Sequence, residues 1–221
     1  MPHEFEPGRE RREGRPASTT RVWGVLGGIA SGKSSVARLL AGPDGLVIDA
    51  DRIVAEHSAR PEFRERVARS FGPAVQGADG AIDRAALAAR VFDDPEARRL
   101  LESFVHPGVR AEIVARLDAA LGSGVPRVVL DVPLLLENEA QHRLTERCDA
   151  LIFVDAPASL RDARAVQTRG WNAGEVARRE SQQMPLAEKR ARAAHVLVNA
   201  GDRARLEHEV QELLRSLEHA P

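Results

Sequence analysis

Short apolar runs alternate along this chain with longer segments in which apolar residues recur every three or four positions. The runs are rich in β-branched residues and occupy residues 22–26, 46–48, 128–131, 151–155 and 196–198. Strands of this kind are typically buried on both faces, as in parallel sheets, and the helical segments between them supply the covering layers. The pattern therefore predicts an α/β fold with a five-stranded parallel sheet flanked by helices.

The segment between the second and third runs is helical in its spacing and too long for a simple crossover. We therefore predict an inserted helical subdomain over residues 52–121. Pro107 has no backbone N–H to donate within a helix, so we predict a helix boundary at His106–Pro107. Beyond it, apolar residues recur every four positions and predict an amphipathic helix that Gly122 ends. These residues are Val109, Ile113, Leu117 and Leu121.

The length of 221 residues suits one α/β domain with insertions rather than two separate domains. We expect a single domain over residues 21–221. Its core combines three segments, residues 21–51, 122–157 and 195–221. Residues 1–20 mix arginine and glutamate with proline and glycine, a composition that predicts a disordered tail.

The charge balance gives no reason to expect a polyanionic partner. The chain has 33 acidic and 32 basic side chains, so we expect neither nucleic acid nor an anionic membrane as a partner. No apolar run approaches the length of a membrane span. The single cysteine, Cys148, excludes an internal disulfide and fits a reducing compartment. We expect a cytoplasmic protein that is a monomer or a weak homo-oligomer.

A glycine-rich stretch follows the first apolar run and precedes a helical one. It reads GGIASGKSS and fits the pattern G-x-x-x-x-G-K-[ST] with Gly27, Gly32, Lys33 and Ser34 at the fixed positions. Glycines let backbone N–H groups approach phosphate oxygens, and the helix that starts at Gly32 directs its positive end at the same anion. Lys33 would reach the β- and γ-phosphates, and the Ser34 hydroxyl would ligate Mg²⁺. The stretch therefore predicts a nucleoside triphosphate site made by Gly28, Ile29, Ala30, Ser31, Gly32, Lys33, Ser34 and Ser35.

Carboxylates follow the second and third strands, at the sheet edge where parallel sheets bind ligands. Asp51 either accepts or orients the proton of an attacking hydroxyl, or caps the helix that begins near Arg52. Asp49 has the structural role in this interpretation. Asp131 either belongs to a magnesium shell or makes a turn hydrogen bond before Pro133.

The segment 158–194 is helical and unusually rich in arginine. Its arginines are either solvated helix faces or part of a mobile lid that neutralises charge on a transferring phosphoryl group. Residues 170–174 would supply the flexible joint of such a lid. Arg164 and Arg169 are the candidates for contact with the β- and γ-phosphates.

Taken in order, several motifs resemble those of the dephospho-CoA kinase family, over residues 22 to about 201. Besides the glycine-rich loop, they are VIDAD at 47–51, His106-Pro107, VPLL with Glu137 at 132–137, and Asn-x-Gly at 199–201. The resemblance implies a P-loop kinase fold that phosphorylates the ribose 3′-hydroxyl of dephospho-CoA with MgATP.

The resemblance also implies roles for individual residues. Asp51, Lys33, Arg164 and Arg169 would be catalytic, and Ser34 and Asp131 would hold Mg²⁺. Asn199 would contact the adenine of ATP, or serve only as a turn residue before Gly201. The dephospho-CoA site would use Asp51, Arg84, His106, Pro133 and Glu137. Two of these have simpler explanations, because His106 suits a structural role and Arg84 suits an ion pair with Asp79 or Asp83.

Two rival functions are weighed against this one. Another P-loop small-molecule kinase would act on a nucleoside monophosphate, shikimate or gluconate, and a panel of acceptors separates these. A GTP-dependent switch should carry N-K-x-D and D-x-x-G motifs, and neither occurs in the chain.

Overall fold

The computed structural model describes residues 20–77, 79–92 and 94–218. Residues 1–19 lie outside the described residues, and with them nearly all of the tail predicted over residues 1–20.

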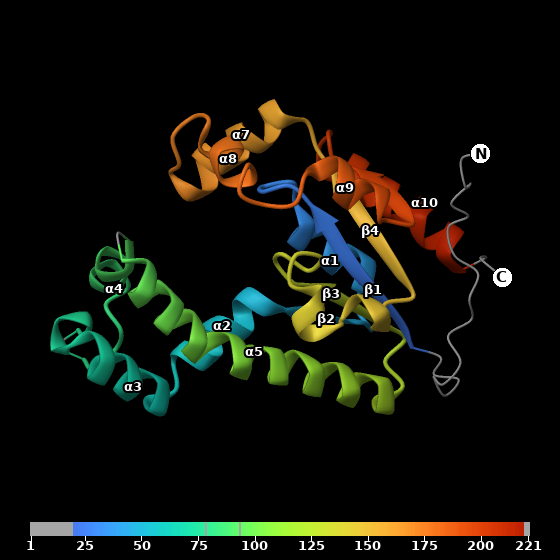
Figure 1. Cartoon of the computed structure of the whole chain (residues 1–221). Coiled ribbons are helices and arrows are strands. Elements are labelled where there is room, and N and C mark those ends of the chain that lie inside the picture. The colour runs from blue at the N-terminus through green and yellow to red at the C-terminus, as the bar shows by residue number, and fades with distance from the viewer. Residues whose placement is uncertain (1–19, 78, 93, 219–221) are drawn as a thin grey trace, which may run out of the picture.

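Five strands form one parallel sheet, as the apolar runs predicted. They are β1 (Arg21–Gly27), β2 (Leu46–Asp49), β3 (Arg127–Asp131), β4 (Ala150–Asp155) and β5 (His195–Val198). Their order is β2-β3-β1-β4-β5, and all four neighbouring pairs are parallel. β1 lies at the centre, so the loop that leaves its carboxyl end emerges in the middle of the sheet edge (Figure 1).

Helices cover both faces of the sheet, so the core consists of two apolar layers, one on each face. On one face α1 (Lys33–Ala41) and α10 (Arg203–Glu218) pack against each other and the strands, with Leu40 fully buried. On the other face α2 (Ala50–Ser58) packs on α5 (Pro95–Ser123), which buries Ile113 and Leu117. Each such aliphatic side chain stabilises the fold by about 1.5–3 kcal/mol.

The predicted helix boundary at His106–Pro107 is wrong, because α5 continues through Pro107 as one 29-residue helix. A proline inside a helix costs about 3 kcal/mol, since it removes one backbone hydrogen bond and crowds the preceding turn. The apolar stripe that follows it, including Val109 and Ile113, is buried against the core. The free energy of that burial exceeds the local penalty, so packing decides the course of the helix.

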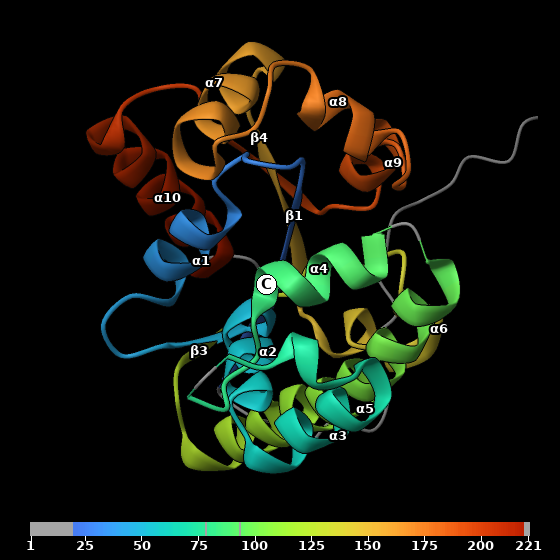
Figure 2. The ribbon, with the colours of Figure 1, turned by 90° about the vertical axis from the view of Figure 1, so that its left-hand side faces the viewer.

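The segment predicted as an inserted subdomain contains α2, α3 (Pro61–Phe71), α4 (Arg84–Phe92) and α5. In Figure 1 these helices extend from the left of the molecule to below the sheet, and in Figure 2 they occupy its lower part. α5 ends at Gly124, whose φ of 77° is the left-handed conformation of a helix C-cap, two residues beyond the predicted Gly122.

The arginine-rich segment forms α7 (Ala158–Arg169), α8 (Glu175–Glu180) and α9 (Leu186–Ala191). Both views place α7 and α8 above the carboxyl end of β1 (Figures 1 and 2). Gly170 and Gly174, with φ of 64° and 83°, bound the stretch that joins these two helices. The remaining short elements are α6 (Glu139–His142) and two 3₁₀ turns, Pro73–Val75 and Thr145–Arg147. None of the helices in the described ranges is long and apolar enough to span a membrane.

Candidate active site

The glycine-rich loop connects β1 to α1, and its geometry requires glycine at two of the fixed positions. Gly32 has φ 92°, and a Cβ there would lie 2.3 Å from Asn199 Nδ2. Gly27 has φ 147°, and its Cβ would lie 2.6 Å from the carbonyl oxygen of Val154. Side chains at these positions would therefore force the loop away from Asn199 and β4.

Lys33 begins α1 and turns back into the loop. Its Nζ donates to the carbonyl oxygens of Gly27 (3.1 Å) and Gly28 (2.8 Å). Burial of the ammonium lowers the pKa of Lys33 to about 8, against the opposing attraction of the Asp131 carboxylate. Phosphate oxygens can therefore replace these two carbonyl oxygens as hydrogen-bond acceptors for the Lys33 ammonium.

We expect this lowered pKa to make nucleotide binding take up a proton. In the free protein part of the Lys33 population is neutral near pH 8, whereas a bound triphosphate favours the ammonium and raises the pKa. Titration calorimetry with MgATP at about pH 8.5, in two buffers of different ionisation enthalpy, should show this uptake. The uptake should vanish at about pH 6.5, where the lysine is already protonated, and in Lys33→Met. Equal uptake at both pH values would contradict the prediction.

Asp131 lies beside Lys33 and Ser34, and two further carboxylates act on it electrostatically. Asp131, at the end of β3, is only 6% exposed, and burial raises the pKa of its carboxyl while a hydrogen bond from Ser34 and the charge of Lys33 lower it. The charges of Asp49 and Asp51 raise it further, so both lie within electrostatic reach of Asp131. The residues that the sequence assigned to metal and proton transfer thus lie at one sheet edge.

The structure separates the two aspartates of the VIDAD motif. Asp49 is the N-cap of α2, and its Oδ1 accepts the backbone N–H of Arg52 at 3.0 Å. The structural role predicted for Asp49 is confirmed, and the capping alternative for Asp51 is wrong. Asp51 lies in the first turn of α2 with an exposed side chain.

A cavity of about 400 Å³ lies between α2, α3, α4 and α5, and Asp51 lines it together with Arg84. Its remaining walls include apolar side chains such as Val54, Leu87 and Val105. A charged end and an apolar wall suit an acceptor that is anionic at one end and apolar elsewhere.

The ion-pair alternatives for Arg84 find no support in the described part of the chain. Asp83 instead accepts the backbone N–H groups at the start of α4, and Asp79 accepts that of Ala81. Arg84 lines the cavity from the first turn of α4.

The other three residues predicted for the acceptor site do not line this cavity. His106 and Pro133 are exposed, on α5 and in the loop after β3. Glu137 pairs with the buried Lys189 of α9 at 2.8 Å and accepts the backbone N–H of Met184 at 3.2 Å. Glu137 thus ties the loop after β3 to the lid, and its contact with the acceptor stays a prediction.

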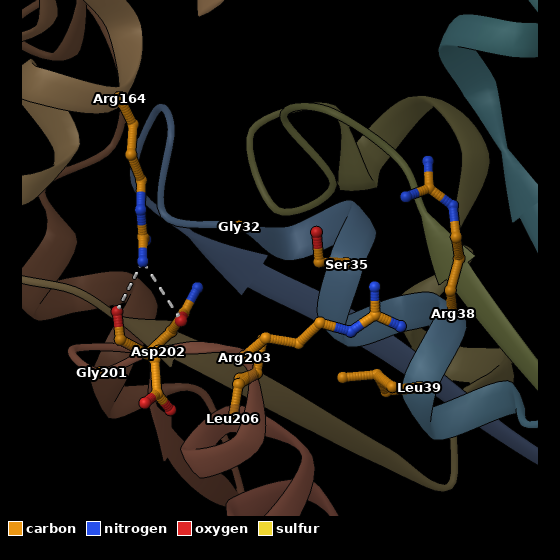
Figure 3. Close-up of a pocket in the computed structure, with 10 residues that line it drawn as sticks. Gly32, Ser35, Arg38, Leu39, Arg164, Gly201, Asp202, Arg203 and Leu206 are labelled. Atoms are coloured by element: carbon orange, nitrogen blue, oxygen red, sulfur yellow. Dashed lines mark hydrogen bonds between the residues drawn. The ribbon is translucent and has the colours of Figure 1, made fainter. Parts of the chain in front are cut away.

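A second cavity, of about 480 Å³, opens on the other side of the loop between α1 and α10. Asn199 and Arg164 line it together with Gly32 and Ser35 (Figure 3). Asn199 is 4% exposed and donates through Nδ2 to the carbonyl oxygen of Ser31 at 2.7 Å. This position suits a nucleoside attached to phosphates that the loop holds.

Arg164 connects the lid to this cavity. Its guanidinium donates to the Asn199 side-chain oxygen (3.3 Å) and backbone oxygen (3.4 Å), and to the Ser31 carbonyl (3.4 Å). The dashed lines in Figure 3 mark the bonds from Arg164 to Asn199. Arg164 therefore reaches the rim of the loop in this structure.

Arg169 is held by an aromatic ring at the end of α7. Its guanidinium carbon lies 4.9 Å from the centroid of Trp171, and that of Arg179 lies 4.3 Å from the same centroid. The charge of Arg169 also lowers the pKa of Lys33, so its guanidinium lies within electrostatic reach of the loop. Nothing in the spacing of the sequence singled out Trp171.

Two further lid residues escaped the sequence analysis. Arg161 is buried and pairs with Glu180, which also contacts the loop at Ile29. Arg161 was one arginine among many in this segment, and Glu180 had no motif around it. Burial distinguishes these two residues from most other charged residues of the segment. The irregular spacing of apolar residues in this segment does not predict which charged side chains are buried.

The oxygens at this edge suit a magnesium ion that completes its shell with phosphates and water. The described residues contain no cluster of three or more histidine, cysteine, aspartate or glutamate side chains that would hold a metal by themselves. Mg²⁺ in phosphate-transfer sites commonly uses one or two carboxylates plus substrate phosphates. Ser34 Oγ and the Asp131 carboxylate fit this requirement.

Known proteins are similar to this chain over most of its length. A family model for dephospho-CoA kinase matches residues 21–205. Dephospho-CoA kinases of Symbiobacterium thermophilum and Methylococcus capsulatus are 41% and 43% identical to this chain, over 89% and 88% of it and 81% and 95% of their own lengths.

Two solved structures share the fold of this chain. The crystal structure of TT1252 from Thermus thermophilus has 38% identity and a TM-score of 0.70 over 90% of this chain and 98% of its own. Dephospho-CoA kinase from Campylobacter jejuni, at 22% identity and a TM-score of 0.65 over the same shares, supports the fold alone. The predicted fold class is therefore confirmed, and this chain belongs to the dephospho-CoA kinase family.

Proposed function

We propose that this protein transfers the γ-phosphoryl group of MgATP to the ribose 3′-hydroxyl of dephospho-CoA, giving coenzyme A and ADP. Its family carries out ATP-dependent phosphorylation of this acceptor. The observation that carries the proposal is the place of Asp51, which lines the cavity beside α2 and acts electrostatically on Asp131 next to the loop.

Nucleotide binding would use the loop and the cavity beyond it. The backbone N–H groups of Lys33 and Ser34, in the first turn of α1, have no acceptor within the helix and suit phosphate oxygens. The nucleoside would enter the cavity that Asn199 and Arg164 line. Mg²⁺, held by Ser34 and Asp131, would offset charge on the β- and γ-phosphates.

Transfer requires positioning and charge neutralisation rather than a covalent intermediate. Asp51 would orient the 3′-hydroxyl and accept its proton as the oxygen attacks phosphorus. Lys33, Arg164 and Arg169 would neutralise the charge that develops on the transferring group and on ADP. Arg84 would bind an anionic group of the acceptor, and we assign His106, Pro133 and Glu137 to the rim of the acceptor site.

A panel of acceptors tests this proposal. We expect ADP release by the purified protein with MgATP to depend on dephospho-CoA, and not on AMP, shikimate or gluconate. Coenzyme A is the matched control, because its 3′-position is already phosphorylated, and it should not support turnover. Mass spectrometry should find the product heavier by one phosphoryl group. Turnover of another acceptor, with none for dephospho-CoA, would refute the acceptor and leave the kinase fold intact.

Two finer features also belong to the proposal. We infer that the protein acts in the cytoplasm, which the single cysteine supports, and that it is a monomer or a weak homo-oligomer. Light scattering across a range of protein concentrations measures the oligomeric state.

A further inference from the structure

A buried ion pair connects the lid to the phosphate-binding loop. Arg161 of α7 is 7% exposed, and its Nη1 lies 2.5 Å from Oε1 of Glu180 in α8. The Glu180 side chain is only 14% exposed. Breaking a pair at this depth leaves a poorly solvated charge, which makes the pair more consequential than those on the surface of α8.

Each partner is fixed to a different part of the molecule. Arg161 Nε donates to the backbone carbonyl of Ala156, directly after β4, at 3.1 Å. Glu180 Oε1 accepts the backbone N–H of Ile29, in the glycine-rich loop, at 2.7 Å. One carboxylate oxygen thereby joins α7, α8 and the loop, and Arg161 Nε connects this group to the end of β4.

The space around this pair is closely filled on the side of the loop. A Cβ at Gly28 would lie 2.6 Å from Glu180 Oε1 and 2.7 Å from Arg161 Nη1. The first residues of the loop therefore pack directly against the ion pair, and glycine at position 28 permits that approach.

The carboxylate does not occupy the amides best suited to phosphate. It takes the N–H of Ile29, whereas those of Lys33 and Ser34 stay at the open start of α1. A carboxylate so near a triphosphate site would nevertheless repel the nucleotide if its charge were not balanced. The Arg161 guanidinium supplies that balance at hydrogen-bond distance.

We propose that Arg161 and Glu180 form a charge-balanced latch that holds the first turn of the phosphate-binding loop against the lid. Both are positioning residues: Glu180 orients the loop through Ile29, and Arg161 keeps the carboxylate from repelling the nucleotide. The inference rests on the nucleotide site of the proposed function and is independent of the acceptor.

The latch predicts an asymmetry between two single substitutions. Arg161→Gln leaves the Glu180 charge unpaired beside the phosphates and should weaken binding of a magnesium nucleotide by about tenfold or more. Glu180→Gln keeps an acceptor for the Ile29 N–H and removes the negative charge, so binding should be no weaker than in the wild type. The double variant Arg161→Gln/Glu180→Gln should return to within about twofold of the wild-type Kd.

The experiment is calorimetric titration of each protein with the magnesium complex of a non-hydrolysable ATP analogue, without acceptor. Thermal unfolding without nucleotide establishes that each variant is folded at the titration temperature. Equal weakening in both single variants, or no recovery in the double variant, would overturn the latch, because a merely structural pair predicts both. If Arg161→Gln does not fold, titration of Glu180→Gln alone tests the latch. Nucleotide binding weaker than that of the wild type in this variant would overturn the proposal.

These outcomes are separable from failure of the proposed function. A wild-type protein that binds no nucleotide contradicts the nucleotide site itself. If the wild-type protein binds nucleotide and phosphorylates dephospho-CoA, but the two single variants bind nucleotide with equal affinity, only the latch is contradicted.

Discussion

Asp51→Asn is expected to lower kcat for dephospho-CoA phosphorylation by about 10²–10⁴-fold, the range for loss of a general base. Asparagine keeps the shape of the side chain but cannot take the proton of the 3′-hydroxyl. Asp51 is exposed in the first turn of α2 and lines the cavity that we propose for the acceptor, so the substitution disturbs no buried contact. The KM for MgATP should change little, and steady-state kinetics with each substrate varied separates the two effects.

The matched control is the other aspartate of the same motif. Asp49→Asn should keep nearly full activity, because Asp49 caps α2 and asparagine is an equally good N-cap. If Asp51→Asn lost less than about tenfold in kcat, or Asp49→Asn lost as much as Asp51→Asn, the assignment of the base to Asp51 would be wrong.

Lys33→Met should lower kcat/KM for MgATP by about 10²–10³-fold, the effect of losing one preorganised electrostatic contact to the transition state. Within the described residues, Lys33 Nζ donates to the loop carbonyls of Gly27 and Gly28, at 3.1 and 2.8 Å. Those contacts can be exchanged for phosphate oxygens, whereas a methionine supplies none. Kinetics and calorimetric titration with MgATP measure the loss.

The same substitution should not destabilise the nucleotide-free protein. Burial lowers the pKa of Lys33 from 10.5 to about 8, so the folded state disfavours its ammonium. The resulting loss of stability grows as the pH falls below 10.5 and is complete below about pH 8. Methionine removes the penalty, and the melting temperature at about pH 7 should stay the same or rise. A large fall in melting temperature together with the loss of activity would mean that Lys33 acts mainly in the fold.

The elements of the core were predictable because their causes are local. Each strand is a short apolar run, and the glycine-rich loop needs backbone conformations that its own residues determine, such as φ 92° at Gly32. Proximity of Asp51 to Asp131 also followed, since the carboxyl ends of neighbouring parallel strands meet at one edge.

Some local signals pointed the wrong way or were ambiguous. Pro107 favoured a helix boundary, but the buried stripe of α5 outweighed its penalty, and the free energy of that burial depends on a sheet that is remote in sequence. The two aspartates of VIDAD both suit an N-cap, so the sequence favoured Asp49 for the structural role without excluding Asp51, and the start of α2 distinguishes them.

By itself, the sequence determined the parallel sheet, the phosphate-binding loop and the family, because strand periodicity and loop chemistry act over a few neighbouring residues. Tertiary structure alone decided which lid residues meet the loop: Glu180 contacts Ile29 across 151 positions, and Arg164 contacts Ser31 across 133. Such pairs form only when the lid packs over the carboxyl end of β1. The way one segment packs on another does not change the periodicity of either sequence, so these contacts cannot be predicted from the pattern.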